Sequence, residues 1–164
     1  MKKICLLASI VLLVIVFLGY QFMTKDNALQ ARQAEIHEKG ILVMPFDLDK
    51  TTHHFKQTED GGVMEIRVKN PDDEEQINLI RQHLKKELDL FASGDFQDPS
   101  SLHGADMPGL ATLGSSADKF SVEYSDLPDG AQLTYISDDQ DVVAAFHQWF
   151  MAQMTDHGAD AMGY

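Results

Sequence analysis

The stretch HHFKQTEDGGVMEIRVKNPDDEEQINLIRQHLKKEL, residues 53–88, carries the clearest folding signal in the chain. It begins with two strand-like segments around the turn from Glu59 to Gly62, where glycine supplies the positive φ that tight hairpins need. Pro71 and the acids after it favour the start of a helix. Apolar residues then recur at helical spacing, namely Ile77, Ile80, Leu84, Leu88 and Phe91. The stretch therefore predicts a strand–strand–helix unit.

The same order of elements returns near the C-terminus. Residues 119–125 and 131–137 predict two strands around the turn Leu127-Pro128-Asp129-Gly130, and Asp138 or Asp139 caps a helix. The apolar stripe of this helix consists of Val143, Phe146, Trp149, Phe150 and Met154. All of these but Trp149 match members of the first stripe at an offset of 66 residues (143 − 77). Two such units predict an α+β domain with a four-stranded antiparallel sheet and both helices on one face.

The chain before this domain has a different composition. Lys2 and Lys3 precede an apolar run over residues 4–23, which is long enough to span a bilayer and longer than a usual signal-peptide core. Lysines on the short side favour a cytoplasmic N-terminus. We therefore expect a membrane anchor over residues 1–23, with cleavage as a signal segment after Ala31 as the alternative. A tether over residues 24–44 follows, and a transmembrane helix thus precedes the α+β domain.

These boundaries predict a single-pass protein of a bacterial inner membrane with its C-terminal domain in the periplasm. The exported α+β domain comprises residues 45–164, with halves 45–94 and 119–164 and a connector 95–118 rich in Gly, Asp, Ser and Pro. A connector of this length is expected to be functional or disordered. Cys5 is the only cysteine and lies in the apolar run, so the exported part has no internal disulfide.

The chain is strongly acidic, with 26 Asp and Glu against 13 Lys and Arg and a net charge of −13. Residues 24–164 carry 11 basic and 26 acidic side chains, a balance of −15. This surface argues against nucleic-acid binding, which needs clustered Lys and Arg. It favours cations or a basic protein partner.

The histidines are the most informative polar residues. His53 and His54 are adjacent on a predicted strand and so point to opposite faces. The connector presents His103 four residues before Met107, a pair of ligand types that copper accepts. The predicted ligands of a transition metal, copper before zinc, are His53, His54, His103, Met107, His147 and His157, with His83 a weaker candidate beside an apolar stripe.

Several segments resemble a poorly characterised family of small exported bacterial proteins that often carry the name aspartate carbamoyltransferase. The resemblance covers about residues 45–160 and rests on Asp49 to Phe55, Gly61-Gly62, Lys69 to Pro71, Ile80 to Leu84, Gly94 to Phe96, His103 to Leu110, His147 to Phe150, Ala152-Gln153 and Asp156 to Gly158. The family name implies transfer of a carbamoyl group. That chemistry needs convergent arginines for phosphate and carboxylates, and the chain has only Arg32, Arg67 and Arg81.

Three hypotheses for the function follow. The first is a membrane-anchored periplasmic domain that binds a transition metal through His and Met side chains. The second is an acidic interaction module that docks a basic protein without metal. The third is a small-molecule enzyme, which is less favoured because the sequence has no nucleophile elbow, phosphate-binding glycine loop or H-E-x-x-H motif. The sequence leaves the oligomeric state open.

Overall fold

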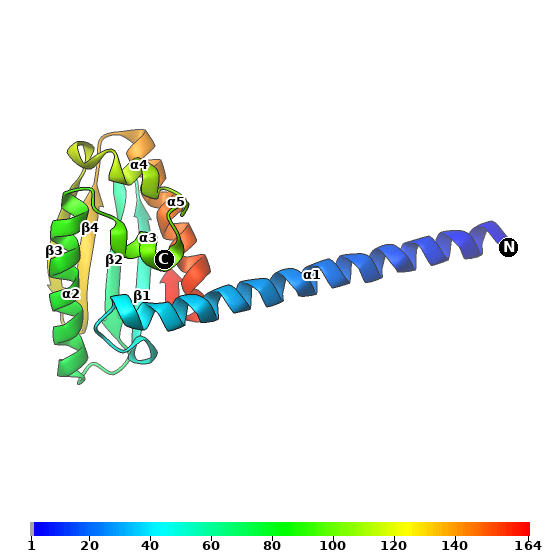
Figure 1. The fold of residues 1–164 in the computed structure, drawn as a ribbon, viewed down its shortest axis with the longest axis horizontal. Helices are drawn as coiled ribbons and strands as arrows, with labels where there is room; N and C mark the ends of the chain where they lie inside the picture. The colour runs from blue at the N-terminus through cyan, green and yellow to red at the C-terminus, as the bar shows by residue number, and fades with distance from the viewer. Residues whose placement is uncertain (1) are drawn as a thin grey trace.

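The computed structural model describes the backbone of residues 2–164 and the side chains of residues 12–164. A long helix, α1 (Lys2–Val43), projects from a domain in which helices pack on a sheet (Figure 1). The strands are β1 (Thr51–Thr58), β2 (Gly61–Val68), β3 (Ser121–Leu127), β4 (Gly130–Ile136) and β5 (Ala161–Gly163). The remaining helices are α2 (Glu74–Ala92), α3 (Gln97–His103), α4 (Leu110–Gly114) and α5 (Gln140–His157). The predicted α+β class is confirmed.

The sheet has one strand more than the sequence predicts. Its order is β3-β4-β2-β1-β5, in which β2 and β4 join the two antiparallel hairpins and β5 runs parallel to β1. The prediction of a four-stranded antiparallel sheet is therefore wrong, because the sheet is five-stranded and mixed. After α5 the chain turns at Gly158, whose φ of +55° suits glycine, and places Ala161 beside His53. A strand of three residues is too short to show alternation in the sequence.

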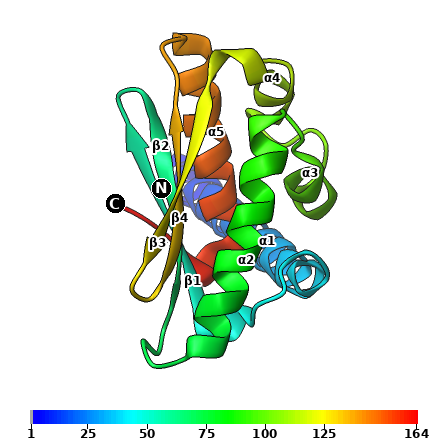
Figure 2. The same cartoon turned by 90° about the vertical axis from the view of Figure 1, so that its left-hand side faces the viewer.

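Helices α2 and α5 cover the same face of the sheet, as predicted (Figure 2). α2 packs on β3 and β4, whereas α5 packs on β1 and β2. Each begins at a capping aspartate, since Asp73 accepts from the backbone N–H of Gln76 and Asp139 accepts from that of Asp141. The predicted stripes supply much of the core, and their fully buried members are Ile80, Leu84, Phe146, Trp149 and Phe150.

The predicted anchor and tether form one continuous helix from Lys2 to Val43, which passes through Gly40 although glycine is typical of a helix end. Gly40 instead lets α1 approach the chain that follows it, because a Cβ there would lie 2.7 Å from Cδ1 of Leu48. Ile36 is fully buried and holds the last turns of α1 on the domain. Tertiary packing therefore overrides the local signal of glycine in this helix.

Among the residues whose side chains are described, no helix is long and apolar enough to cross a membrane. The transmembrane helix predicted over residues 1–23 is thus not found in this part of the chain. Residues 1–11 of that prediction lie outside the described side chains. Residues 12–23 belong to α1 and expose apolar side chains, among them Leu12, Phe17 and Phe22.

The connector 95–118 is not an unstructured loop. It contains α3, which packs against α1, and α4, which packs against α5. Leu102, Leu110 and Leu113 are buried in this region, so the connector adds to the core. The sequence misses these helices because each is shorter than the periodic pattern that identifies a helix.

Replacing Gly109 by alanine is expected to lower the free energy of unfolding by about 2 kcal/mol. Gly109 has a φ of +87°, and a Cβ there would lie 2.2 Å from the carbonyl oxygen of Ala145 in α5. Gly114 is the matched control, because a Cβ at this other end of α4 would meet only the Gly94 oxygen at 3.5 Å. Urea unfolding of G109A and G114A measures the difference. Equal losses would contradict the close approach of α4 to α5.

Candidate functional site

A small cavity lies inside the domain between the sheet and helices α2, α3 and α5. Its volume is about 50 Å³, which is room for a few water molecules or an ion. Four histidines line it: His53 from β1, His83 from α2, His103 from the end of α3 and His157 from the end of α5. The other polar or sulfur-containing side chains of the wall are Met44, Met64, Glu87, Asp98, Trp149 and Gln153.

Three of the imidazoles form a row, which we call the histidine row. The ring centres of His103 and His157 are 5.0 Å apart and meet edge to face, and those of His157 and His53 are 5.0 Å apart and stacked. Two imidazoles that share one ion at about 2.0–2.1 Å have ring centres roughly 5–6 Å apart. The spacing suits a shared ion, although stacked rings must turn before their nitrogens can point to it.

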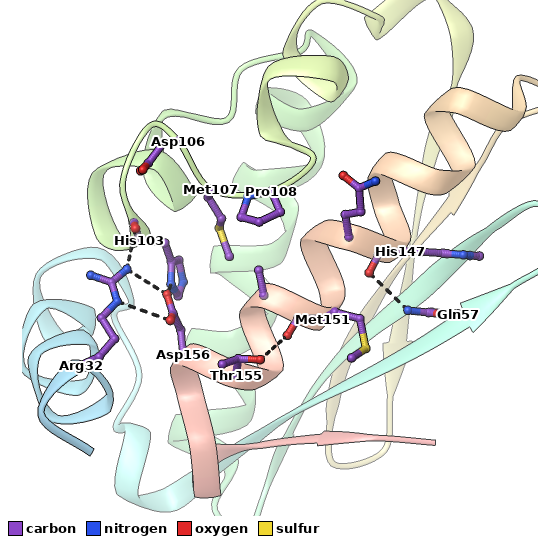
Figure 3. A pocket seen from close by; sticks show the side chains of 12 residues that line it. Arg32, Gln57, His103, Asp106, Met107, Pro108, His147, Met151, Thr155 and Asp156 are labelled. Carbon is purple, nitrogen blue, oxygen red and sulfur yellow. Dashed lines mark hydrogen bonds and ion pairs between the residues drawn. The ribbon is translucent and has the colours of Figure 1, made fainter. Parts of the chain in front are cut away.

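Asp156 on α5 orients His103 (Figure 3). Its Oδ2 lies 2.8 Å from Nδ1 of His103 and 2.9 Å from Nη2 of Arg32, and the same Nη2 donates to the His103 carbonyl. A carboxylate can only accept, so Nδ1 of His103 donates and Nε2 carries a lone pair. Burial opposes ionisation of Asp156, but hydrogen bonds from Arg32 and His103 outweigh it and lower the pKa of this carboxyl.

Buried polar atoms without hydrogen-bond partners gather around the cavity. Among the described side chains they are Glu87 Oε1, His103 Nε2, Tyr135 OH, Trp149 Nε1 and Gln153 Oε1. All but Tyr135 belong to residues that line the cavity. Each such group costs about 1–3 kcal/mol when left unsatisfied. Their concentration at one place indicates that the cavity holds water or a polar ligand.

The cavity keeps its histidines neutral. Burial lowers the pKa of His53 well below its ordinary range and lowers the pKa of His83 and of His157 to about 4. Burial also lowers the pKa of His103, against the opposing hydrogen bond and charge of Asp156. Neutral imidazole is the form that binds metal ions. The site therefore presents ligand-competent nitrogens at neutral pH.

Glu87 gives the cavity a carboxyl group that can change charge. Burial, followed by a hydrogen bond with Asp98, raises the pKa of Glu87 to about 7. Its Oε1 lies 3.8 Å from Nδ1 of His83 and 3.6 Å from Nζ of Lys86. Glu87 is therefore partly protonated near neutral pH.

A wider hollow on the surface shares His103 with the cavity (Figure 3). Its volume is about 820 Å³, within the range of ligand-binding clefts. Arg32 of α1, residues 106–108 of the connector and one side of α5 form its walls. We call it the outer hollow. The α5 residues that face it are His147, Gln148, Met151, Ala152, Thr155 and Asp156.

The six predicted metal ligands lie in three places. His53, His103 and His157 meet at the cavity, whereas Met107 and His147 line the outer hollow. Nε2 of His147 lies 3.0 Å from the carbonyl oxygens of both Thr58 and Gly61, so this ring is tied to the hairpin. His54 lies on the opposite face of the sheet, with its ring centre 6.2 Å from that of Tyr164. The structure thus does not bring His54 to either place.

Several residues of the site were not among the predicted ligands. His83, only a weaker candidate in the sequence, lines the cavity together with the three predicted histidines. The sequence did indicate that Met64 faces the core, because alternation along its strand places it on the same face as Ile66. Arg32 was assigned to the tether, and its pairing with Asp156, 124 positions later, has no sequence signal.

Within the described part of the chain, no group of three or more His, Cys, Asp or Glu side chains is arranged to hold a metal ion. An ion in the cavity would therefore need turned imidazoles or a thioether from Met44 or Met64. Both methionines line the same cavity as the histidine row.

Comparisons of the chain with known protein families, curated proteins and solved structures found no match. They neither support nor contradict the resemblance to the exported bacterial family. The function therefore has to be inferred from the geometry and chemistry of the cavity.

Proposed function

We propose that the domain binds a transition metal ion, copper before zinc, in the histidine-lined cavity. The observation that carries the proposal is His103, whose side chain is 1% exposed and whose Nε2 has no partner. Its Nδ1 is held by Asp156 at 2.8 Å. Metal-binding histidines almost always donate their other ring N–H to a carboxylate, backbone carbonyl or water. The pair of Asp156 and His103 already has this arrangement.

The other donors of the cavity favour a soft cation. Met44 and Met64 offer thioether sulfur beside neutral imidazoles, and thioether ligands select cuprous copper. Structural zinc is almost always bound by four Cys, His or carboxylate ligands in a tetrahedron. The described side chains present no group of three such ligands as they stand. Copper held by imidazole and thioether is therefore the better candidate.

We also propose that residues 4–23 hold the protein in a bacterial inner membrane, with the domain in the periplasm. The support is the apolar run behind Lys2 and Lys3 in the sequence. Mass spectrometry of the mature protein checks it. A mature N-terminus near residue 32 would contradict the anchor and leave a cleaved signal segment.

An anaerobic titration of the full chain with cuprous ion against a competing chelator tests the metal proposal. We expect one ion per chain and an at least about 100-fold weaker Kd for His103→Ala, since even changes in supporting residues cost about 10–100-fold. His54→Ala is the matched control, because His54 lies on the other face of the sheet. Thermal unfolding should show stabilisation by about 2.7 kcal/mol when the free ion is at 100 times Kd.

Two results would overturn this function. One is a wild-type protein that binds neither cuprous ion nor zinc more tightly than a chain unfolded in urea. The other is an equal loss of affinity in H54A and H103A, because the ion would then not lie in the cavity. Either result would favour the acidic interaction module, for which the balance of −15 over residues 24–164 is the supporting observation.

A further inference from the structure

We infer that the outer edge of β3 binds a basic, extended segment of another protein, which pairs with β3 as an added strand of the sheet. The segment alternates apolar residues, on the face that α2 covers, with Lys or Arg on the uncovered face of the sheet. This surface lies outside the cavity and the outer hollow, so the inference goes beyond the proposed metal site and does not depend on it.

β3 is the last strand at one side of the sheet. The order β3-β4-β2-β1-β5 places no strand beyond it in the described part of the chain. β3 pairs with β4 from Ser121 to Leu127 without a bulge, around a tight turn. In such a hairpin every second residue bonds to the neighbouring strand, beginning with the residue next to the turn. The backbone N–H and C=O groups of Val122, Tyr124 and Asp126 therefore point outward, where they can bond to another strand.

The two edges of the sheet differ in how they are protected against other strands. At the opposite edge, β5 has only three residues. β3 has seven residues, and neither proline, lysine nor a bulge interrupts them, although these are the usual means by which proteins block an edge. An edge of this length and regularity is a template for strand addition, in which main-chain hydrogen bonds supply the affinity.

The two faces of this edge recognise different side chains. On the face that α2 covers, Val122 and Tyr124 are partly buried and pack against the core. Apolar residues of an added strand, directly opposite these two, would extend this layer. On the uncovered face Glu123 is exposed between Ser121 and Ser125. A Lys or Arg opposite Glu123 forms a favourable cross-strand pair, whereas an acid there is unfavourable.

Charge and orientation both favour a different protein over a second copy of the chain. β3 contains Glu123 and Asp126 and no basic residue, and no Lys or Arg follows Lys119 in the sequence. α1 leaves the domain on the side away from β3 (Figure 1). Two copies paired antiparallel through β3 would therefore point their α1 helices in opposite directions, which does not fit two anchors in one membrane. A separate protein can reach β3 without this restriction.

Fluorescence anisotropy of a labelled peptide with the full chain tests the inference. The probe has about nine residues, the upper part of the usual strand length, and alternates valine and lysine. Its valine N–H groups are the ones expected to donate to β3, because residues directly opposite one another share a face of the sheet. The control peptide has the same sequence with these valine nitrogens methylated. It keeps the charge and loses the main-chain donors.

We expect the unmethylated peptide to bind and to slow hydrogen exchange over residues 121–127, and the methylated one to bind at least about tenfold more weakly. Val122→Pro removes an outward N–H but no hydrogen bond within the hairpin, and it should weaken binding by a similar factor. Glu123→Lys should instead prefer a peptide that alternates valine and glutamate. Glu38→Lys, the same charge change at an exposed position of α1, is the matched control and should keep the wild-type Kd.

Three results would overturn the inference and leave the metal site standing. The first is a wild-type chain that does not bind the peptide. The second is equal binding of the methylated peptide, or equal effects of E38K and E123K, because charge alone would then account for the affinity. The third is a dimer that protects residues 121–127 without peptide, since a second copy would then occupy the edge. The methylated peptide keeps the test decisive if V122P does not fold.

Discussion

Without a bound ion, the domain is expected to become several kcal/mol less stable between about pH 6.5 and pH 4. Burial lowers the pKa of His83 and of His157 to about 4, and it lowers the pKa of His53 well below its ordinary value. In the unfolded chain these imidazoles titrate near 6.5. Between about pH 6.5 and pH 4 these imidazoles bind protons in the unfolded state but stay neutral in the folded state. The free energy of unfolding therefore falls as the pH falls.

The size of the effect follows from the shifts. Each histidine whose pKa falls from about 6.5 in the unfolded chain to about 4 in the fold lowers the free energy of unfolding by about 3 kcal/mol as the pH drops between these values. Glu87 acts in the opposite direction. Its pKa of about 7 in the folded state makes the fold bind a proton more readily than the unfolded chain between about pH 7 and 4.5. One carboxyl offsets about one histidine, so the net change remains a loss.

Urea unfolding at several pH values between 7 and 4.5 measures this dependence. His157→Phe should reduce the slope by about one proton, or about 1.4 kcal/mol per pH unit, because it removes one buried titrating group. His54→Phe is the control, since His54 is only half-buried and lies outside the cavity. A stability that does not change between pH 6.5 and 4.5 would contradict the neutral, buried state of the histidine row.

Asp156→Ala is expected to lower the free energy of unfolding by about 2–3 kcal/mol and to weaken metal binding by about 10–100-fold. The variant removes the carboxylate from Arg32 and leaves Nδ1 of the buried His103 without its acceptor. The loss is smaller than the 3–5 kcal/mol of a fully buried pair, because the Arg32 and Asp156 side chains are 33% and 16% exposed. His103 would then be free to turn its ring.

Asp160→Ala is the matched control for this effect. Asp160 also pairs with α1, through His37 at 3.0 Å, and its side chain is 25% exposed, but it does not line the cavity. We expect D160A to lose some stability and to keep the wild-type Kd, which competition titration and urea unfolding measure together. Equal metal affinities in D156A and D160A would show that Asp156 does not position His103.

The sequence alone determined the elements that depend on local interactions. Glycine in the turns at residues 61 and 130 and alternating apolar residues specify the two hairpins. Asp73 and Asp139 cap the two long helices, whose stripes repeat at a fixed offset and place both on one face of the sheet. The same local patterns placed His53 on the face of its strand opposite to His54, because side chains alternate along a strand.

Only the tertiary structure decided which side chains meet. In the structure β5 pairs with the edge of β1, α1 continues through Gly40 and packs on the domain, and His83 lines the cavity. Arg32, Asp156 and His103 meet from three separate helices, with Arg32 and Asp156 124 positions apart. Local sequence preferences do not depend on such long-range contacts and cannot predict them. They form because burial of Ile36 and the core stripes brings the helices together, and the polar groups trapped between them must then find partners.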